Sequence, residues 1–185
     1  MSRLFLAAGL ALGVLVPQSA LAASSVFGGG MAEACSKAAV RGEVEAQYEK
    51  LCTESLQTEF LDTRDRAGTF VNRGVLRLRR AKYDDATKDF NDALRLSPDM
   101  GEAFVNRGAA LVGRHQFAEA LVDINKAITL GIDEPAKAYY NRALAYEGLD
   151  NLKAAYFDYR KALEINPDWE PPKKELARFS VAQQP

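Results

Sequence analysis

Three Asn-Arg pairs are the residues of this chain whose type and spacing are best suited to recognition. The Asn residues are separated by 34 and 35 positions (106 − 72 and 141 − 106), and an Asp follows each Arg 16 positions later. An amide offers two hydrogen-bond donors and an acceptor, and a guanidinium pairs well with a carboxylate. The pattern therefore indicates either a repeated binding site or a repeated piece of scaffold. The residues are Asn72, Arg73, Asp89; Asn106, Arg107, Asp123; and Asn141, Arg142, Asp158.

Residues for catalysis or metal binding are scarce by comparison. The chain has one His, His115, and no nucleophile motif surrounds it. The run from Gly28 to Gly30 has neither the preceding strand nor the Lys of a phosphate-binding loop. Two Cys without nearby His or acidic ligands cannot form a standard zinc site. We therefore expect no catalytic residue, no metal, no cofactor and no enzymatic activity.

The first 22 residues have the features of a cleaved export signal. Arg3 precedes an apolar run over residues 4–16, and the stretch ends in the small-x-small sequence Ala20-Leu21-Ala22. We predict cleavage after Ala22 and a flexible start over residues 23–30. The apolar run is too short for a retained membrane anchor, and no Cys follows it where a lipoprotein signal needs one. The expected location is the periplasm, with secretion as the alternative.

Charge and cysteine content fit an exported protein of one domain. Cleavage leaves 163 residues (185 − 22) with a formal net charge of −2 (23 − 25), which gives no general attraction to nucleic acid. The one basic cluster, Arg77 to Lys82, is interpreted as a solvated helix end. In an oxidising compartment, Cys35 and Cys52 favour a disulfide, with two buried free thiols as the alternative.

An apolar pattern recurs after each Asn-Arg pair and predicts helices. Offsets of 0, 3, 4, 7, 10 and 11 from Tyr83, Phe117 and Leu152 place apolar or small residues on one stripe of a helix. Pro98 and Pro167 close two of these helices. Each period therefore contains two helices, and repetition at this spacing predicts a solenoid.

These residues resemble the tetratricopeptide repeat family. Its pattern asks for a bulky residue at position 4, small residues at 8, 20 and 27, a large apolar one at 24 and Pro at 32. Residues 67–100 and 136–169 supply all of these, and residues 101–135 lack only the Pro. The resemblance implies an all-α solenoid of three antiparallel helix pairs. Residues 31–66, with short and long helices expected at 31–40 and 50–61, would form a degenerate pair held by the disulfide. Residues 170–185 would form a closing helix and tail.

The resemblance also implies which face binds. The first helix of each repeat would line a concave groove, with Asn72, Asn106 and Asn141 presenting amides to an extended peptide. Relatives that clamp a terminal carboxylate use Lys or Arg at positions 2, 5 and 6 of adjacent repeats, and only Lys137 fits here, which argues against such a clamp. The Asn residues could instead bond neighbouring backbone or water. The remaining groove residues are expected to be apolar: Val71, Val75, Val105, Ala109, Tyr140 and Leu144.

The Arg and Asp of each period are interpreted as structural ion pairs. Their pairing could lie within a repeat, as in Arg73 with Asp89, or between repeats, as in Arg107 with Asp89. The leading hypothesis for function is a non-catalytic scaffold that binds an unidentified protein or peptide. An architectural or self-associating envelope protein is the alternative, and the oligomeric state stays open. The whole pattern looks like small exported proteins of this family from Gram-negative bacteria.

Overall fold

A computed structural model describes residues 20–26 and 30–181 of the chain, with side chains up to Phe179. Within these residues the chain forms nine α-helices and no strand. Most of the predicted export signal, residues 1–19, lies outside the described residues, as do Gly28 and Gly29. None of the helices in the described part of the chain is long and apolar enough to cross a membrane.

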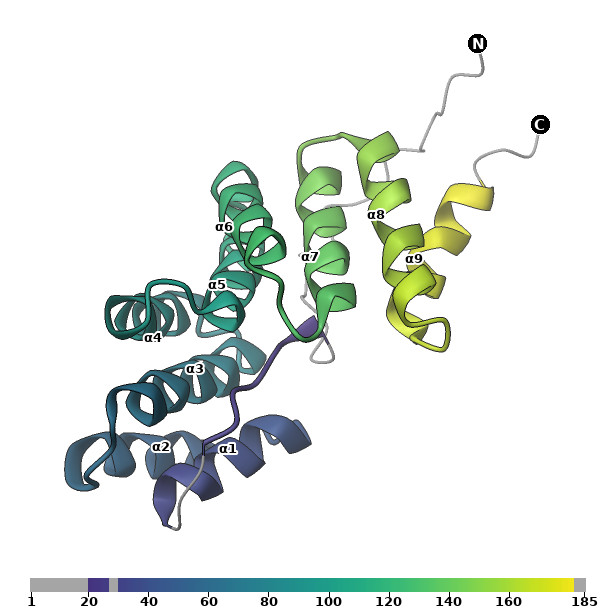
Figure 1. Ribbon diagram of the computed structural model, residues 1–185. Helices are drawn as coiled ribbons and strands as arrows, with labels where there is room; N and C mark the ends of the chain where they lie inside the picture. Colours follow the sequence, from purple (N-terminus) through teal and green to yellow (C-terminus); the bar gives the residue numbers. More distant parts are fainter. Residues whose placement is uncertain (1–19, 27–29, 182–185) are drawn as a thin grey trace.

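The helices pack as antiparallel pairs that follow one another in a curved array (Figure 1). The predicted solenoid is confirmed. The pairs, in chain order, are α1 (Met31–Arg41) with α2 (Ala46–Thr58), α3 (Thr63–Arg79) with α4 (Tyr83–Leu96), α5 (Gly101–Gly113) with α6 (Phe117–Leu130), and α7 (Pro135–Gly148) with α8 (Leu152–Ile165). A last helix, α9 (Glu170–Val181), packs on α8.

Successive first helices also contact each other, because α5 touches both α3 and α7, and α1 touches α3. The first helices therefore form one layer and the second helices another. Two buried clusters of apolar side chains fill the space between helices, one spanning α1 to α5 and the other α5 to α9. Phe179 of α9 is buried against Tyr156 and Tyr159, so this helix covers the apolar end of the last repeat.

Small residues allow the two helices of a repeat to approach. A Cβ added at Gly74 would lie 2.5 Å from Cε1 of Phe90, and one added at Gly108 would lie 2.5 Å from Cγ1 of Ile124. Both distances are far below van der Waals contact. The small residue at position 8 of the repeat therefore makes room for the large one at position 24.

The N-terminal pair differs from the sequence expectation in its boundaries. The second helix of this pair was expected at residues 50–61, whereas α2 begins at Ala46 and ends at Thr58. Glu59 leaves the helix with extended backbone, and its carboxylate accepts hydrogen bonds from the backbone N–H groups of Met31 and Ala32, at 2.7 and 2.9 Å. The chain leaves α2 early because Glu59 satisfies the free donors at the start of α1.

Helix α3 begins at Thr63, four residues before the position at which the first full repeat was expected to begin. The side chain of Asp62 accepts a hydrogen bond from the backbone N–H of Asp65 at 2.7 Å and caps α3 at its start. A disulfide joins Cys35 on α1 to Cys52 on α2, both fully buried. A bridge across this sequence separation contributes about 3 kcal/mol in the chain-entropy model, so it holds α1 against the rest of the solenoid.

Candidate functional site

The three repeated Asn residues lie on one face of the layer formed by the first helices of the repeats. We call this face the asparagine face. Asn72 is on α3, Asn106 on α5 and Asn141 on α7, and all three side chains are 0% exposed. What buries them is the chain itself: residues 20–26, here called the N-terminal segment, cross this face from α7 toward α1 (Figure 1). The face predicted to be an open groove is thus occupied.

Each amide binds the backbone of one residue of the N-terminal segment. Asn72 accepts from the Ser24 N–H at 2.9 Å and donates to the Ser24 carbonyl at 2.8 Å. Asn106 makes the same pair of bonds to Ala22, whose N–H lies 3.0 Å from Oδ1. Asn141 donates to the Ala20 carbonyl at 3.1 Å, while its buried Oδ1 has no hydrogen-bond partner within the described residues.

The order of these contacts defines the direction in which the N-terminal segment crosses the face. Successive repeats bind every second residue, and the segment runs from the third repeat to the first. Alternate residues of an extended chain point to the same side, so Ala22 and Ser24 make the same pair of bonds, and Ala20 makes one bond of this kind. Because the amides contact only main-chain atoms, they fix the direction and register of a peptide independently of its sequence.

Two further groups bind the segment from its sides. Lys137 donates from Nζ to the Leu21 carbonyl at 2.9 Å, and Ser36 on α1 donates from Oγ to the Ser24 carbonyl at 2.9 Å. The predicted apolar residues of the groove are all buried. Val71, Val75 and Ala109 lie in the cluster that includes Leu21, whereas Val105, Tyr140 and Leu144 lie in the cluster that includes Ala20 and Ala22.

Residues 23–26, the described beginning of the segment expected to be flexible over residues 23–30, lie against the helices. Ser24 and Val26 are buried, at 8% and 6% exposure, and Ser24 is bonded through both its N–H and its carbonyl. The sequence has no helical period over these residues. An extended strand whose hydrogen bonds all go to distant side chains has no local sequence pattern.

The Arg of each repeat pairs with the Asp of the same repeat. The pairs are Arg73 with Asp89 (2.7 Å), Arg107 with Asp123 (2.6 Å) and Arg142 with Asp158 (2.7 Å). The remaining Nη1 of each guanidinium reaches the second helix of the preceding repeat, at Thr53, Asn91 and Asn125 respectively. Each Arg thus ties its own helix pair together and also ties that pair to the one before it.

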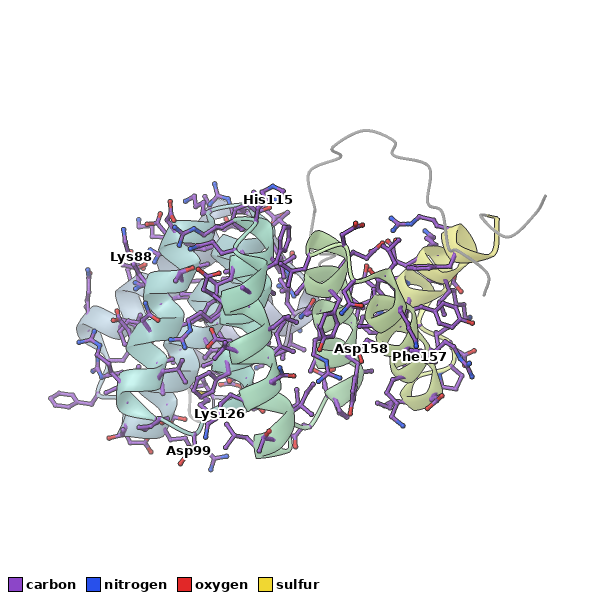
Figure 2. The ribbon with its side chains drawn as sticks, turned by 90° about the horizontal axis from the view of Figure 1, so that it is seen from above. Lys88, Asp99, His115, Lys126, Phe157 and Asp158 are labelled. Carbon is purple, nitrogen blue, oxygen red and sulfur yellow. A yellow bond between two sulfur atoms is a disulfide. The ribbon has the colours of Figure 1, made fainter. Side chains whose placement is uncertain are left out.

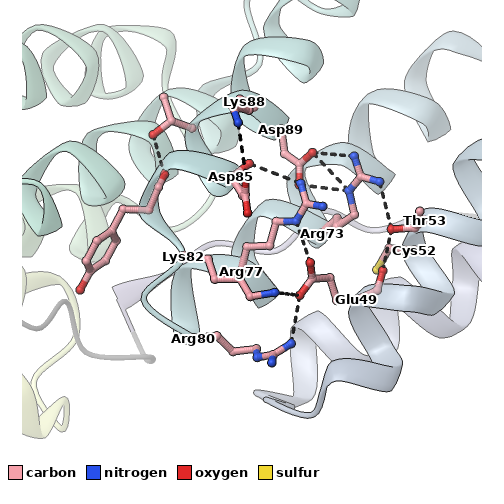
Figure 3. A network of polar contacts seen from close by, with 12 residues as sticks. Glu49, Cys52, Thr53, Arg73, Arg77, Arg80, Lys82, Asp85, Lys88 and Asp89 are labelled. Carbon is pink, nitrogen blue, oxygen red and sulfur yellow. Dashed lines mark hydrogen bonds and ion pairs between the residues drawn. The ribbon is translucent and has the colours of Figure 1, made fainter.

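A larger polar network extends this tie at the N-terminal pair (Figure 3). Arg77 bridges Asp89 at 2.8 Å and Glu49 at 3.1 Å, and Glu49 also binds Arg80 and Lys82. The basic cluster read from the sequence as a solvated helix end instead contacts the N-terminal pair: Arg77, Arg80 and Lys82 bind Glu49 on α2, and Arg79 donates to the Ala39 carbonyl on α1. Sequence reasoning missed Glu49 because α2 carries no complete repeat pattern that would place it.

The two acids of this network respond differently to their surroundings. Burial raises the pKa of Asp89 above its ordinary value, and the nearby Arg73 and Arg77 only partly oppose this shift. Burial also acts to raise the pKa of Glu49, but hydrogen bonds from Lys82 and Arg77 outweigh it, so this pKa lies below its ordinary value. Both acids have a structural environment, away from the asparagine face.

Groups for catalysis are not assembled in the described part of the chain. His115 has a left-handed backbone (φ 60°) in the turn between α5 and α6, at the end of the helices opposite Asp99 (Figure 2). Ala81 and Asp150 occupy the same place in the other two repeats, with φ of 55° and 59°. His115 is therefore a turn residue. No cluster of His, Cys, Asp or Glu suited to a metal occurs among the described residues.

Comparison with known proteins agrees with this architecture. The family model described as "Tetratricopeptide repeat" matches residues 136–168. No curated protein matches the chain by sequence. The first tetratricopeptide domain of human RPAP3 is 29% identical, with a TM-score of 0.58 over 63% of this chain and 91% of that one. The first such domain of Spaghetti (RPAP3), solved with the HSP90 peptide SRMEEVD, is 28% identical, with a TM-score of 0.59 over 64% and 94%.

A bacterial structure covers more of the chain. MamA from Desulfovibrio magneticus RS-1 has a TM-score of 0.63 over 83% of this chain and 85% of that one, at 23% identity. At this identity the likeness concerns the fold alone. Together, the matches support the tetratricopeptide repeat and show the solenoid to be of that type.

Proposed function

We propose that this tetratricopeptide solenoid is a non-catalytic scaffold that binds an extended peptide, or an extended segment of a protein, on its asparagine face. The observation that carries the proposal is the set of hydrogen bonds from Asn72, Asn106 and Asn141 to alternate residues of the N-terminal segment. Main-chain hydrogen bonds of this kind provide affinity, while pockets for alternate side chains provide specificity.

The binding of a separate peptide by a similar domain supports this proposal. The Spaghetti domain was solved with a short peptide, and its fold covers 64% of this chain. The ligand here differs in character, since the asparagine face binds small uncharged residues. Export is a separate part of the proposal, and the disulfide between Cys35 and Cys52 is consistent with an oxidising compartment.

Binding of a synthetic peptide with the sequence of residues 18–22, Gln-Ser-Ala-Leu-Ala, tests the proposal. The peptide carries a fluorophore and is titrated against the chain processed after Ala22, with fluorescence anisotropy as the readout. The double variant Asn106→Ala with Asn141→Ala removes donors and acceptors of three hydrogen bonds seen in the structure. At about 1 kcal/mol per bond, we expect at least a tenfold loss of affinity.

A matched control uses the same substitution at Asn91 and Asn125, which lie on the second helices α4 and α6. These two side chains contact Arg107 and Arg142 and not the N-terminal segment. The control variant should bind the peptide like the wild type. Equal peptide affinity for the wild type and the Asn106→Ala, Asn141→Ala variant, both folded by circular dichroism, would refute binding on this face.

A further inference from the structure

The N-terminal segment crosses the predicted cleavage site while it lies on the asparagine face. Residues 20–22 bind Asn141, Asn106 and Lys137, whereas residues 23–26 bind Asn72 and Ser36. Hydrolysis of the bond between Ala22 and Ala23 by a peptidase consumes one water and leaves a carboxylate on Ala22 and an ammonium group on Ala23. The bound strand would then be divided inside its own site.

We propose that this cleavage releases residues 20–22 from the asparagine face. The part of the face that they occupied then becomes an open binding site. Residues 23–26 stay in place, and the part of the face around Asn106, Asn141 and Lys137 binds the carboxyl end of a separate peptide with the pattern small–apolar–small. This inference rests on the proposed function, and it names the chemistry of the ligand.

Contacts C-terminal to the cleavage point are sufficient to keep residues 23–26 bound. Ser24 makes three hydrogen bonds, two with Asn72 and one with Ser36. Val26 is buried, and a Cβ added at Gly68 would lie 3.1 Å from its Cγ2, so the segment packs closely against α3 at this Gly. The chain then enters α1, which the disulfide ties to α2.

Contacts N-terminal to the cleavage point define the sequence pattern. Ala20 and Ala22 are at most 3% exposed and share a cluster with Val105, Tyr140 and Leu144. Larger side chains at these two places would need the helices to move. Leu21 points into the other cluster and is 3% exposed, so that place accepts a larger apolar residue.

Steric and charge arguments indicate that the separate peptide ends at the position of Ala22. Ala23 occupies the next place along the strand, so a continuing chain would collide with it. A cavity of about 320 Å³ beside this point is lined in part by Ala23, Arg79, Glu134 and Lys137. Arg79 Nε is buried without a hydrogen-bond partner among the described residues, and Lys137 is paired with Glu134 at 2.7 Å. A terminal carboxylate here would lie beside Arg79.

Charges on the other side of the N-terminal segment stabilise the ammonium group that cleavage would create on Ala23. A second cavity, of about 670 Å³, is bordered by Ala23 and Ser24, and its charged lining consists of Asp99, Glu102, Asp133 and Arg64. Three carboxylates against one guanidinium make this side acidic. The face therefore has an acidic side to hold the ammonium group and a basic side to receive the carboxylate of a ligand.

Titration of two peptides against two forms of the protein tests the inference. The peptides have the sequence Gln-Ser-Ala-Leu-Ala and end either in a free carboxylate or in an amide. The proteins are the full chain purified unprocessed and the chain recovered after cleavage, each checked by mass spectrometry and circular dichroism. The free acid should bind the cleaved chain at least tenfold more tightly than it binds the full chain, and at least fivefold more tightly than the amide does.

Two variants locate the effect. Arg79→Gln should reduce the preference for the free acid over the amide, whereas Arg64→Gln, on the acidic side, should retain it. If the cleaved chain does not fold, the full chain with Ala22→Glu replaces it, because a carboxylate forced into this buried place should displace the segment and open the site. Binding of the free acid to that variant, and not to the wild-type full chain, would support the inference.

Equal affinity of the acid peptide for the full and the cleaved chain would overturn the inference, as would equal affinity of acid and amide for the cleaved chain. Either result leaves the proposed function standing if the Asn106→Ala, Asn141→Ala variant still weakens binding of the peptide of residues 18–22. If that variant binds this peptide like the wild type, the proposed function fails with it.

Discussion

Hydrogen exchange of the N-terminal segment should follow the number of bonds that each Asn makes to it. Asn72 and Asn106 each make two hydrogen bonds to one residue of the segment, whereas Asn141 makes one. A buried hydrogen bond contributes about 1 kcal/mol net, and each 1.4 kcal/mol corresponds to a factor of ten in an equilibrium constant. Replacing an Asn by Ala should therefore favour the opened segment by about 25-fold at the first two positions and about fivefold at the third.

The assay is hydrogen–deuterium exchange of the full, uncleaved chain, followed by NMR at the Ala22 and Ser24 amides. These two N–H groups bond directly to Oδ1 of Asn106 and Asn72. Exchange at Ala22 should be about 25-fold faster in Asn106→Ala and at most about fivefold faster in Asn141→Ala. Asn91→Ala, on the outer layer, is the control and should change neither rate.

Two outcomes would refute this reasoning. If the Ala22 amide of the wild type exchanges as fast as a free peptide, the segment is not docked on the asparagine face. If Asn141→Ala accelerates exchange at Ala22 as much as Asn106→Ala does, the number of direct hydrogen bonds does not determine the exchange rate. The whole segment then opens cooperatively.

Two further predictions concern the scaffold. The pKa of Glu49 lies below its usual 4.5, because hydrogen bonds from Lys82 and Arg77 outweigh the effect of burial. The ionised Glu49 therefore stabilises the fold above pH 4.5. This stabilisation is lost as the pH falls through the lower pKa of the folded state. Urea unfolding at pH 3 to 6 should show a smaller loss of stability in acid for Glu49→Gln than for the wild type, and equal losses would contradict the assignment. Gly74→Ala should cost about 1–3 kcal/mol, because the added Cβ would lie 2.5 Å from the Phe90 ring. Thermal melting of the double variant with Phe90→Leu should show partial recovery, and a loss that is simply additive would argue against this clash.

The repeated helices could be predicted because the pattern of apolar residues that specifies each helix lies within that helix. The apolar offsets starting at Tyr83, Phe117 and Leu152 begin at the first residue of α4, α6 and α8. By contrast, the expected helix at 50–61 was misplaced by several residues, because its boundary depends on the contact between Glu59 and the start of α1. Helix periodicity says nothing about such a contact.

The ion pairs were visible in the sequence only in part. The constant separation of 16 between Arg73 and Asp89 and in the later copies is observable without a structure, but both pairings fit it. Helix packing decides between the two pairings. Each Asp binds the Arg of its own repeat, while Nη1 of that Arg reaches the preceding repeat. A second partner such as Thr53 has no repeated counterpart by type, so no pattern identifies it.

The sequence by itself determined the repeat, the helix pairs and the three amides on one face, because each depends on side-chain periodicity along a single helix or between adjacent helices. Only the tertiary structure decided what those amides bind. Asn72, Asn106 and Asn141 contact backbone atoms that lie 48, 84 and 121 residues away along the chain. Backbone groups are the same at every residue, so the sequence carries no mark of which ones an amide will choose, and the choice follows from the path that the chain takes across the folded helices.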